Sequence, residues 1–228
     1  MASTADHRPT AILFDIDGTL INTGGAGATS WRLAFDELYG IPADIGAFTD
    51  TGMTDPEVGR LTFAAVLHRE PTADEFATLM DRRVHHLRRA VAESDGYRVL
   101  AGVEELLPRL LGEGHLLGLV TGNVEPAAHI KLHRANLNRY FAFGGYGSDS
   151  TDRVELSRTA LTRASLVYGE ELALDACVAL GDTPTDVKGA HGAGIRCVGV
   201  ASHKFTADQL REAGADWVIG SLTEQLPF

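Results

Sequence analysis

Two aspartates that follow an apolar run are the residues of this chain with the clearest capacity for chemistry. The run Ala11 to Phe14 is typical of a strand buried on both faces of a parallel sheet, and Asp15 and Asp17 come directly after it. Side chains alternate along a strand, so the two carboxylates leave its end in related directions while Ile16 points the other way. Two like charges this close need a cation between them, or one of them must hold a proton. The pattern therefore predicts an ionised nucleophile beside a proton-transferring acid, with a plain Asp-Gly turn as the alternative.

Polar residues also follow two later apolar runs. Leu116 to Val120 leads into Thr121-Gly122-Asn123, and Cys177 to Leu180 leads into Gly181-Asp182, with Asp186 in the next turn. The carboxyl ends of parallel strands lie side by side, so we expect these residues to converge with the first two aspartates. Gathered carboxylates make a hard-oxygen site that suits Mg²⁺, and the hydroxyl and amides of the Thr-Gly-Asn segment can bind phosphate oxygens at a helix start. Each turn alone is also explained as a helix entry or cap, and only the agreement of three strand ends favours a common site.

The bulk properties restrict the class of protein. The chain has 228 residues, enough for one ordinary domain plus a modest insertion. Its formal charge of -11 repels nucleic acid, anionic membranes and, at long range, phosphate-bearing substrates, so an anion site must be built locally from metal and basic residues. No nucleic-acid or membrane partner is therefore expected.

Location is also predicted from composition. The apolar runs are too short to span a bilayer, and the polar start, Met1 to Pro9, lacks the apolar core of a signal peptide. Cys177 and Cys197 both lie in strand-like runs, where buried small hydrophobic residues are favoured over a disulfide or a metal site. We expect a cytoplasmic protein that is a monomer or a homodimer.

The order of the elements predicts an α/β fold. Strands alternate with helices through the second half of the chain, as in a doubly wound parallel sheet. Between residues 22 and 98 only helical patterns are visible, with no strand pattern. We therefore expect a core made of residues 1–21 and 99–228, with an all-helical cap domain inserted over residues 22–98.

Two helices of this inserted segment carry local predictions. One begins at Asp55-Pro56, with Asp55 as its N-cap and Pro56 in the first turn. The other runs from about Thr72 to Glu93. Its arginine-rich stretch, Arg82 to Arg89, is interpreted as a solvated face.

The motifs resemble those of a known superfamily. Asp15-Ile16-Asp17-Gly18-Thr19, Thr121 and Gly181-Asp182-Thr183-Pro184-Thr185-Asp186 are similar, in order and spacing, to the motifs of the haloacid dehalogenase-like hydrolases. The chain looks like the phosphoglycolate-phosphatase-type branch, whose Rossmann-like core carries a helical cap between the first two motifs. This resemblance implies a magnesium-dependent phosphatase that hydrolyses a small phosphorylated metabolite through an aspartyl-phosphate. A phosphotransferase or sugar-phosphate mutase shares every core residue and stays open as the alternative, and a non-catalytic phosphate-binding or partner-binding protein is less favoured.

The resemblance also implies a role for each motif residue. Asp15 would be the nucleophile, and Asp17 would protonate the leaving oxygen and then activate the hydrolytic water. Thr121 would bind the transferring phosphoryl group. Asp15, the backbone carbonyl of Asp17 and Asp182 would hold Mg²⁺, with Asp186 in support.

The position of the active-site cation departs from the expected pattern. The superfamily carries a lysine or arginine before the helix that precedes the last motif, and Arg153 stands there, without a Lys-Pro pair. A guanidinium can pair the nucleophile and bind phosphate at two points, whereas a plain surface arginine is the alternative. Lys131 is the competing cation, and its mid-helix position predicts an exposed side chain.

The segment Thr51-Gly52-Met53-Thr54-Asp55 resembles the cap loop that meets the substrate in this branch. Gly52 would permit close approach and Thr54 would offer a hydroxyl, while Gly122 and Asn123 would contribute phosphate-binding amides. A plain helix cap is the alternative for Thr54 and Asp55. None of these residues identifies the leaving group.

Overall fold

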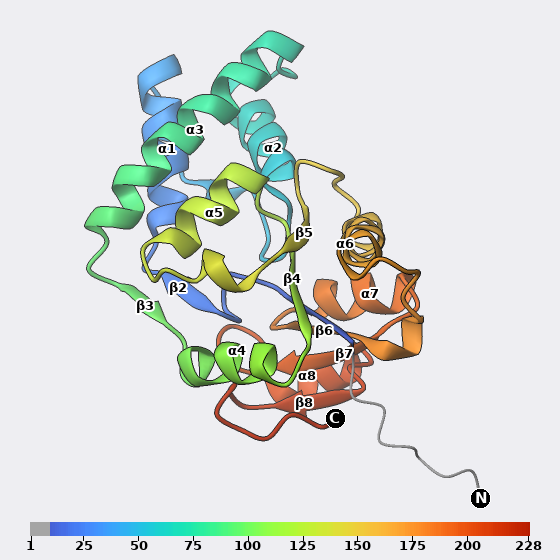
Figure 1. The fold of residues 1–228 in the computed structure, drawn as a ribbon. Helices are drawn as coiled ribbons and strands as arrows, with labels where there is room; N and C mark the ends of the chain where they lie inside the picture. Colours follow the sequence, from blue (N-terminus) through green and yellow to red (C-terminus); the bar gives the residue numbers. More distant parts are fainter. Residues whose placement is uncertain (1–9) are drawn as a thin grey trace, which may run out of the picture.

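The computed structural model describes residues 10–228, so the polar start at residues 1–9 lies outside the described part. Its main sheet has six parallel strands in the order β5-β4-β1-β6-β7-β8 (Figure 1). β1 lies in the interior of the sheet between β4 and β6, so the chain winds outward from it in both directions, and the predicted doubly wound sheet is confirmed. The strands are β1 (Ala11–Phe14), β4 (Leu116–Thr121), β5 (Phe143–Tyr146), β6 (Cys177–Gly181), β7 (Arg196–Val200) and β8 (Trp217–Ile219).

Helices cover both faces of this sheet. Ile12 and Phe14 of β1 belong to one buried cluster together with residues of α4 and α5, whereas Ala11 and Leu13 belong to a second cluster together with residues of α6 and α7. This alternation is what a strand buried on both faces requires, and it explains why β1 is apolar throughout. The core helices are α4 (Val103–Gly112), α5 (Glu125–His133), α6 (Arg153–Tyr168), α7 (Pro184–Gly192) and α8 (Ala207–Glu212). Three short 3₁₀ turns are η1 (Ile45–Ala47), η2 (Asn138–Tyr140) and η3 (Leu174–Ala176).

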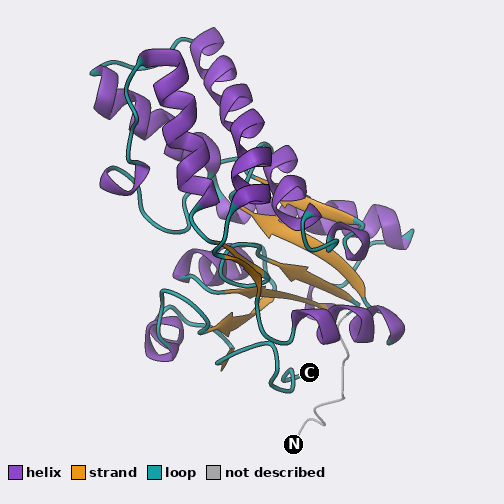
Figure 2. Cartoon of the chain, turned by 90° about the vertical axis from the view of Figure 1, so that its left-hand side faces the viewer, coloured by secondary structure: helices purple, strands orange, loops and turns teal. Residues whose placement is uncertain are grey.

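Three helices, α1 (Ala26–Tyr39), α2 (Asp55–Leu67) and α3 (Ala73–Glu93), form a bundle beyond one end of the sheet (Figure 2). Trp31, Phe35, Phe63 and Leu79 are buried in the centre of this bundle, which therefore has its own apolar core.

Both chain connections to the bundle run through a small antiparallel sheet. β2 (Ile21–Thr23) pairs with β3 (Tyr97–Val99), so the chain enters and leaves the bundle at one place. The sequence pattern predicted no strand in this segment, and that prediction was wrong at its two ends. Strands of three residues are too short to produce a recognisable alternation of apolar and polar residues.

The bundle packs on α5 through apolar side chains. Ala26 of α1 and Leu87 and Val91 of α3 form a buried cluster with Val124 and Ala127, at the start of α5. One face of α5 is consequently covered by the bundle. In the described residues no helix is long and apolar enough to cross a membrane. Both cysteines are free and buried.

Candidate active site

A cavity of about 180 Å³ lies where the helical bundle meets the carboxyl ends of β1 and β4. Asp15, Thr121 and Arg153 line it from the core, and Gly52 and Arg83 line it from the bundle. Of the predicted strand-end residues, Asp15, Asp17, Thr121, Gly122 and Asn123 therefore line one cavity between the two parts of the chain, whereas Asp182 and Asp186 do not line it.

Asp15 continues the line of β1. Its amide donates to the carbonyl of Leu180 at 2.9 Å, so the pairing with β6 extends past the end of the strand and fixes the carboxylate at the sheet edge. Burial raises the pKa of Asp15 to about 7, with a further contribution from the neighbouring charge of Asp186 and an opposing one from Arg153.

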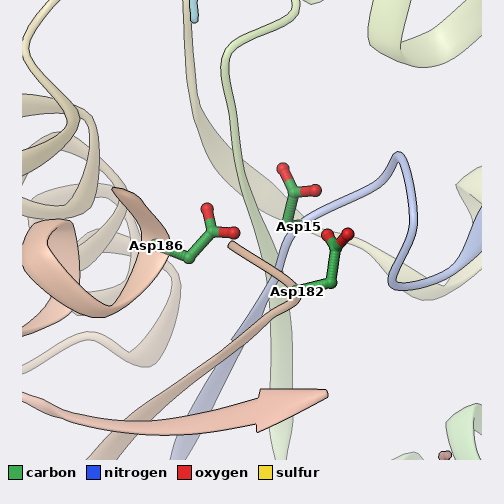
Figure 3. Close-up of side chains that lie close together, drawn as sticks. All are labelled: Asp15, Asp182 and Asp186. Carbon is green, nitrogen blue, oxygen red and sulfur yellow. The ribbon is translucent and has the colours of Figure 1, made fainter. Parts of the chain in front are cut away.

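Three carboxylates from separate segments converge at this edge. Asp15, Asp182 and Asp186 each place an oxygen within 4.8 Å of the others. Figure 3 shows that the three side chains lie close together. Asp182 accepts a hydrogen bond from the Thr19 hydroxyl at 3.3 Å through Oδ1, while its buried Oδ2 has no partner in residues 10–228. Burial, followed by the charge of Asp15, raises the pKa of Asp182 to about 8.

The donor set fits a hard divalent cation. An unpaired buried carboxylate oxygen costs free energy, and two raised carboxyl pKa values mark a site that lacks positive charge. Mg²⁺ prefers oxygen ligands and would supply that charge. Gly18 makes room for Asp182, because a Cβ at Gly18 would lie 2.2 Å from Asp182 Oδ2 and the φ there is +92°.

The two carboxylate oxygens of Asp186 have different partners. Its Oδ2 accepts from the Thr183 amide at 3.0 Å and from the Thr183 hydroxyl at 2.7 Å, which completes a capping box at the start of α7. Its Oδ1 pairs with the Arg153 guanidinium. One oxygen thus fixes the helix start, and the other fixes the arginine.

Arg153 is the first residue of α6 and is 7% exposed. Its Nη2 lies 3.4 Å from Asp15 Oδ1 and also donates to Asp186. Two other guanidinium nitrogens, Nε and Nη1, are buried and have no hydrogen-bond partner in the described residues. The Arg153 guanidinium therefore lies beside the candidate nucleophile Asp15, and its Nε and Nη1 are available to donate to an anionic group.

A second cation reaches the site from α5. Lys131 Nζ donates to Asp17 Oδ2 at 2.6 Å, and its side chain is only 6% exposed. The prediction that Lys131 is exposed was therefore wrong. Sequence position does not tell which face of α5 is covered, and the face that carries Ala127 and Lys131 lies under the bundle.

Asp17 differs from Asp15 in its surroundings. Its carboxylate also accepts from Asn123 Nδ2 at 2.8 Å, and that same amide nitrogen donates to the Thr121 hydroxyl oxygen at 2.8 Å. Burial acts to raise the pKa of Asp17, but the Lys131 ammonium and the hydrogen bonds outweigh it, and the pKa falls below its ordinary value. Because Thr121 accepts this bond, its own proton can be donated to a phosphoryl oxygen.

The cap loop approaches the core very closely at Gly122. The Asp55 amide donates to the Gly122 carbonyl at 2.7 Å, and a Cβ at Gly122 would lie 2.7 Å from the Met53 carbonyl oxygen. Gly52 has a φ of +94°, and a Cβ there would lie 2.9 Å from the Thr185 hydroxyl. Both glycines are therefore needed for the contact between loop and core.

Thr54, rather than Asp55, is the N-cap of α2. The Thr54 hydroxyl pairs with the Glu57 carboxylate at 2.8 Å within a capping box, and Thr54 is fully buried outside the cavity lining. The prediction of Asp55 as N-cap was wrong, because its side chain is used elsewhere. Asp55 Oδ1 accepts from Arg83 at 2.9 Å, and Oδ2 accepts from the Val124 amide at 2.9 Å.

Arg83 is the site residue that sequence reasoning missed. The stretch Arg82 to Arg89 was interpreted as a solvated face, yet Arg83 is 1% exposed. The available signal was helical spacing, because Arg83 falls four residues from both Leu79 and Leu87, which are buried on the same face of α3.

Comparisons with known proteins show which family and which fold this chain shares. The profile of the haloacid dehalogenase-like hydrolases matches residues 9–194. A phosphoglycolate phosphatase of Rhodospirillum rubrum is 31% identical, over 91% of this chain and 85% of its own length. A 5'-nucleotidase of Pseudomonas aeruginosa is 29% identical, over 88% of this chain and 86% of its own length. Among solved structures, CbbY from Rhodobacter sphaeroides in complex with phosphate has a TM-score of 0.72 at 21% identity, covering 95% of this chain and 96% of that one.

Proposed function

Because the chain belongs to the haloacid dehalogenase-like hydrolase family and is a phosphoric monoester hydrolase, we propose that it cleaves small phosphate esters through an aspartyl-phosphate on Asp15, with Mg²⁺ as cofactor. The observation that carries this proposal is the cluster of Asp15, Asp182 and Asp186 beside the buried guanidinium of Arg153. A nucleophile, a cation for the phosphoryl group and ligands for a metal thus lie at one sheet edge. Free, buried cysteines are compatible with our further proposal that the enzyme acts in the cytoplasm.

The first half of the reaction uses Asp15 and Asp17. A carboxylate oxygen of Asp15 attacks phosphorus, and the bond from phosphorus to the leaving oxygen breaks. Asp17 gives its proton to that oxygen. Asp17 is ionised in the free protein because of Lys131, so we infer that it takes up the proton when the dianionic phosphoryl group binds beside it and raises its pKa.

The second half returns the enzyme to its starting state. A water attacks the phosphorus of the aspartyl-phosphate and gives a proton to Asp17. The bond between phosphorus and the Asp15 oxygen breaks, so phosphate is released and the Asp15 carboxylate is restored. Asn123 and Lys131 hold the Asp17 carboxylate through both halves, and Arg153 and Thr121 bind the transferring group.

The residues that would hold Mg²⁺ are Asp15, Asp182 and the backbone carbonyl of Asp17, while Asp186 supports them through Arg153 and the start of α7. The bound ion would neutralise charge on the carboxylates and on the phosphoryl oxygens.

The test is a phosphate-release assay over a panel of metabolite phosphates, with Mg²⁺ and with excess chelator. We expect turnover only with the metal, and no turnover or phosphoenzyme with Asp15→Asn. Asp17→Asn should slow turnover by about a hundredfold to ten-thousandfold, which is the usual range for a lost acid–base group. Full activity in chelator would exclude the metal, and near wild-type hydrolysis by Asp15→Asn would exclude the covalent route. A phosphotransferase would instead yield phosphorylated acceptor in place of inorganic phosphate.

A further inference from the structure

Asp55 is hydrogen-bonded both to the bundle and to the core. Within the bundle, its Oδ1 accepts from Arg83 Nη2 of α3 at 2.9 Å. Toward the core, its Oδ2 accepts from the Val124 amide at 2.9 Å, and its own amide donates to the Gly122 carbonyl at 2.7 Å. Asp55 is buried, and a bond lost away from water costs free energy. One residue of the bundle therefore holds two backbone groups of the loop that follows β4.

These two backbone groups flank Asn123. The Gly122 carbonyl belongs to the peptide group before the Asn123 Cα, and the Val124 amide belongs to the peptide group after it. Each peptide group is planar, so the orientation of the two planes sets the direction in which the side chain leaves the Cα between them. The Asn123 carbonyl is also held, because it accepts from the Gly147 amide at 2.8 Å. The starting direction of the Asn123 side chain thus depends on the bonds of Asp55.

The Asn123 side chain contacts two residues of the proposed reaction. Its Nδ2 donates to Asp17 Oδ2 at 2.8 Å and to the Thr121 hydroxyl oxygen at 2.8 Å. No hydrogen bond within residues 10–228 joins the Asp55 side chain to Asp17 or to Thr121. Asn123 is therefore the link between the bundle residue and the acid–base group.

We propose that Asp55 is a positioning residue for proton transfer, because it fixes the backbone on both sides of Asn123 and so holds the Asn123 carboxamide against Asp17 and Thr121. Arg83 assists by holding the other oxygen of the Asp55 carboxylate. This inference rests on the proposed phosphatase function and adds a residue that touches no reacting atom.

Asp55→Asn is the variant that breaks the contact with the core and keeps the shape of the side chain. An amide has one acceptor oxygen, and the charged guanidinium of Arg83 is a stronger donor than a backbone amide. The oxygen should therefore stay with Arg83. The amide nitrogen then faces the Val124 N–H, so two donors oppose each other and the bond to the core is lost.

The first measurement compares an alkyl phosphate with p-nitrophenyl phosphate. kcat/KM covers the steps up to transfer of the phosphoryl group to Asp15. An alkoxide needs a proton to leave, whereas p-nitrophenolate leaves readily without one. Asp55→Asn should lower kcat/KM by about tenfold for the alkyl ester, a part of the effect of losing the acid–base group, and by less than about threefold for the p-nitrophenyl ester. A purely structural defect lowers both values equally, so equal losses would overturn the inference.

The second measurement is a double-variant cycle with Asn123→Ala. Substitutions that act through one shared contact are not additive, so in the Asn123→Ala background Asp55→Asn should change kcat/KM for the alkyl ester by less than about twofold. The same loss in both backgrounds would show that Asp55 does not act through Asn123. Asp50→Asn is the matched control, because Asp50 is an exposed aspartate just before the cap loop, and it should leave kcat/KM for both esters unchanged.

The cycle does not depend on whether Asp55→Asn folds. If it does not, Asp55→Leu with Arg83→Met removes the buried pair as a unit, which apolar replacements usually tolerate. The loss from this double change should be about tenfold smaller in the Asn123→Ala background than in wild type, and an equal loss would overturn the inference. Wild-type kcat/KM for both esters in Asp55→Asn would overturn this inference alone. Failure of wild type to hydrolyse any ester with Mg²⁺ would overturn the proposed function, and this inference with it.

Discussion

Arg153 and Lys131 pair with different carboxylates at the site. Arg153 pairs with Asp15 and Asp186, while Lys131 pairs with Asp17. The consequences for the two candidate catalytic aspartates are opposite, since the pKa of Asp15 is raised and that of Asp17 is lowered. Two carboxyl groups separated in this way are suited to different roles in one reaction.

The raised pKa values give a direct prediction for metal binding. Without metal, Asp15 and Asp182 hold protons up to about pH 7 and about pH 8. Protonated carboxyls are poor ligands, so Mg²⁺ affinity should rise with pH between about 6 and 9 and then level off. Calorimetric titration at four pH values measures this, and an affinity that is flat across the range would contradict it.

The same shifts predict how the metal-free protein responds to pH. The folded pKa values of Asp15 and Asp182 lie above the ordinary 3.8, so the folded state binds more protons than the unfolded state between about pH 4 and pH 8. The stability associated with protonation is fully present below about pH 4 and is lost as the pH rises through 7 to 8. Thermal unfolding in chelator should therefore show this contribution declining over that window, and saturating Mg²⁺ should reduce the decline.

Because Lys131 is buried and pairs with Asp17, its substitution should reduce activity, whereas substitution of an exposed lysine should not. Lys131→Met removes the cation that holds Asp17, which should raise the pKa of Asp17 and reduce kcat by about tenfold or more, a part of the effect of losing the acid–base group itself. The pH dependence of kcat measures the shift, which should be toward higher pH. Lys188→Met, on the exposed side of α7, is the control. Equal activity and equal pH profiles in both variants would exclude the role of Lys131.

Removing Arg153 should affect both stability and activity. Arg153→Ala leaves Asp15 and Asp186 buried without their partner, and breaking such a pair typically costs about 3–5 kcal/mol. We expect severe loss of turnover and a lower Tm in chelator, with partial recovery of both in Arg153→Lys. Arg158→Ala, an exposed position on the same helix, should change neither. Should Arg153→Ala remain active while Lys131→Met is inactive, the two cations have exchanged roles.

At the level of elements, the strand ends and helix starts decide where the chemistry lies. α6 and α7 begin at the site, so Arg153 and Asp186 are held by the first turns of helices whose N-caps are bonded. α2 begins at the cap loop in the same way, and its capping box uses the Thr54 hydroxyl. The helix starts thus fix the backbone positions from which Arg153 reaches the cavity and Asp186 reaches Arg153.

Close approach of the cap loop to Gly122 can be tested directly. In Gly122→Ala the new methyl group would lie 2.7 Å from the Met53 carbonyl oxygen, so the loop must move away from the core. We expect a loss in kcat/KM of about tenfold, because small displacements of groups that position substrate are costly, with little change in far-UV circular dichroism. Gly112→Ala is the control, since a Cβ there meets no atom within 4 Å. An unchanged kcat/KM in Gly122→Ala would show that this contact is not needed.

Local patterns were sufficient for the sheet and for the strand-end aspartates, because apolar runs and the polar residues after them are adjacent in sequence. They were insufficient for Lys131 and Arg83. Both lie on helices, and the covering of each helix face is decided by another element: the cap bundle for Lys131, and α1 and α2 for Arg83, whose side chain contacts Trp31 and Asp55. The two strands β2 and β3 were missed because three residues are too few to show an alternation of apolar and polar side chains.

The whole molecule is more acidic than the lining of its cavity. The chain carries a net charge of -11, whereas the cavity lining has three cations, Arg83, Lys131 and Arg153, against the three carboxylates of Asp15, Asp17 and Asp55. Beyond about one Debye length, about 8 Å at physiological salt, a phosphate ester experiences chiefly the negative surface. Attraction therefore acts only at short range.

Salt should consequently assist the encounter with substrate. Raising KCl from about 20 to about 200 mM should increase kcat/KM for an anionic ester by about twofold to threefold, since screening weakens the long-range repulsion. Steady-state kinetics at constant Mg²⁺ activity measures this, with sucrose at matched osmolarity as the control. A decrease in kcat/KM with salt would mean that the cavity cations dominate at long range.

The paired strands β2 and β3 have a consequence for how such a chain can be altered. Ile21 and Val99 are direct partners in the ladder, so the two ends of the inserted segment meet as neighbouring strands. Insertions are tolerated where their ends lie close together, because the host needs no rearrangement to accept them. A different helical bundle could be grafted between these two residues while the six-stranded sheet and its aspartates keep their places. The chain connections between the sheet and the helical bundle are thereby confined to one place, while the bundle also packs on α5.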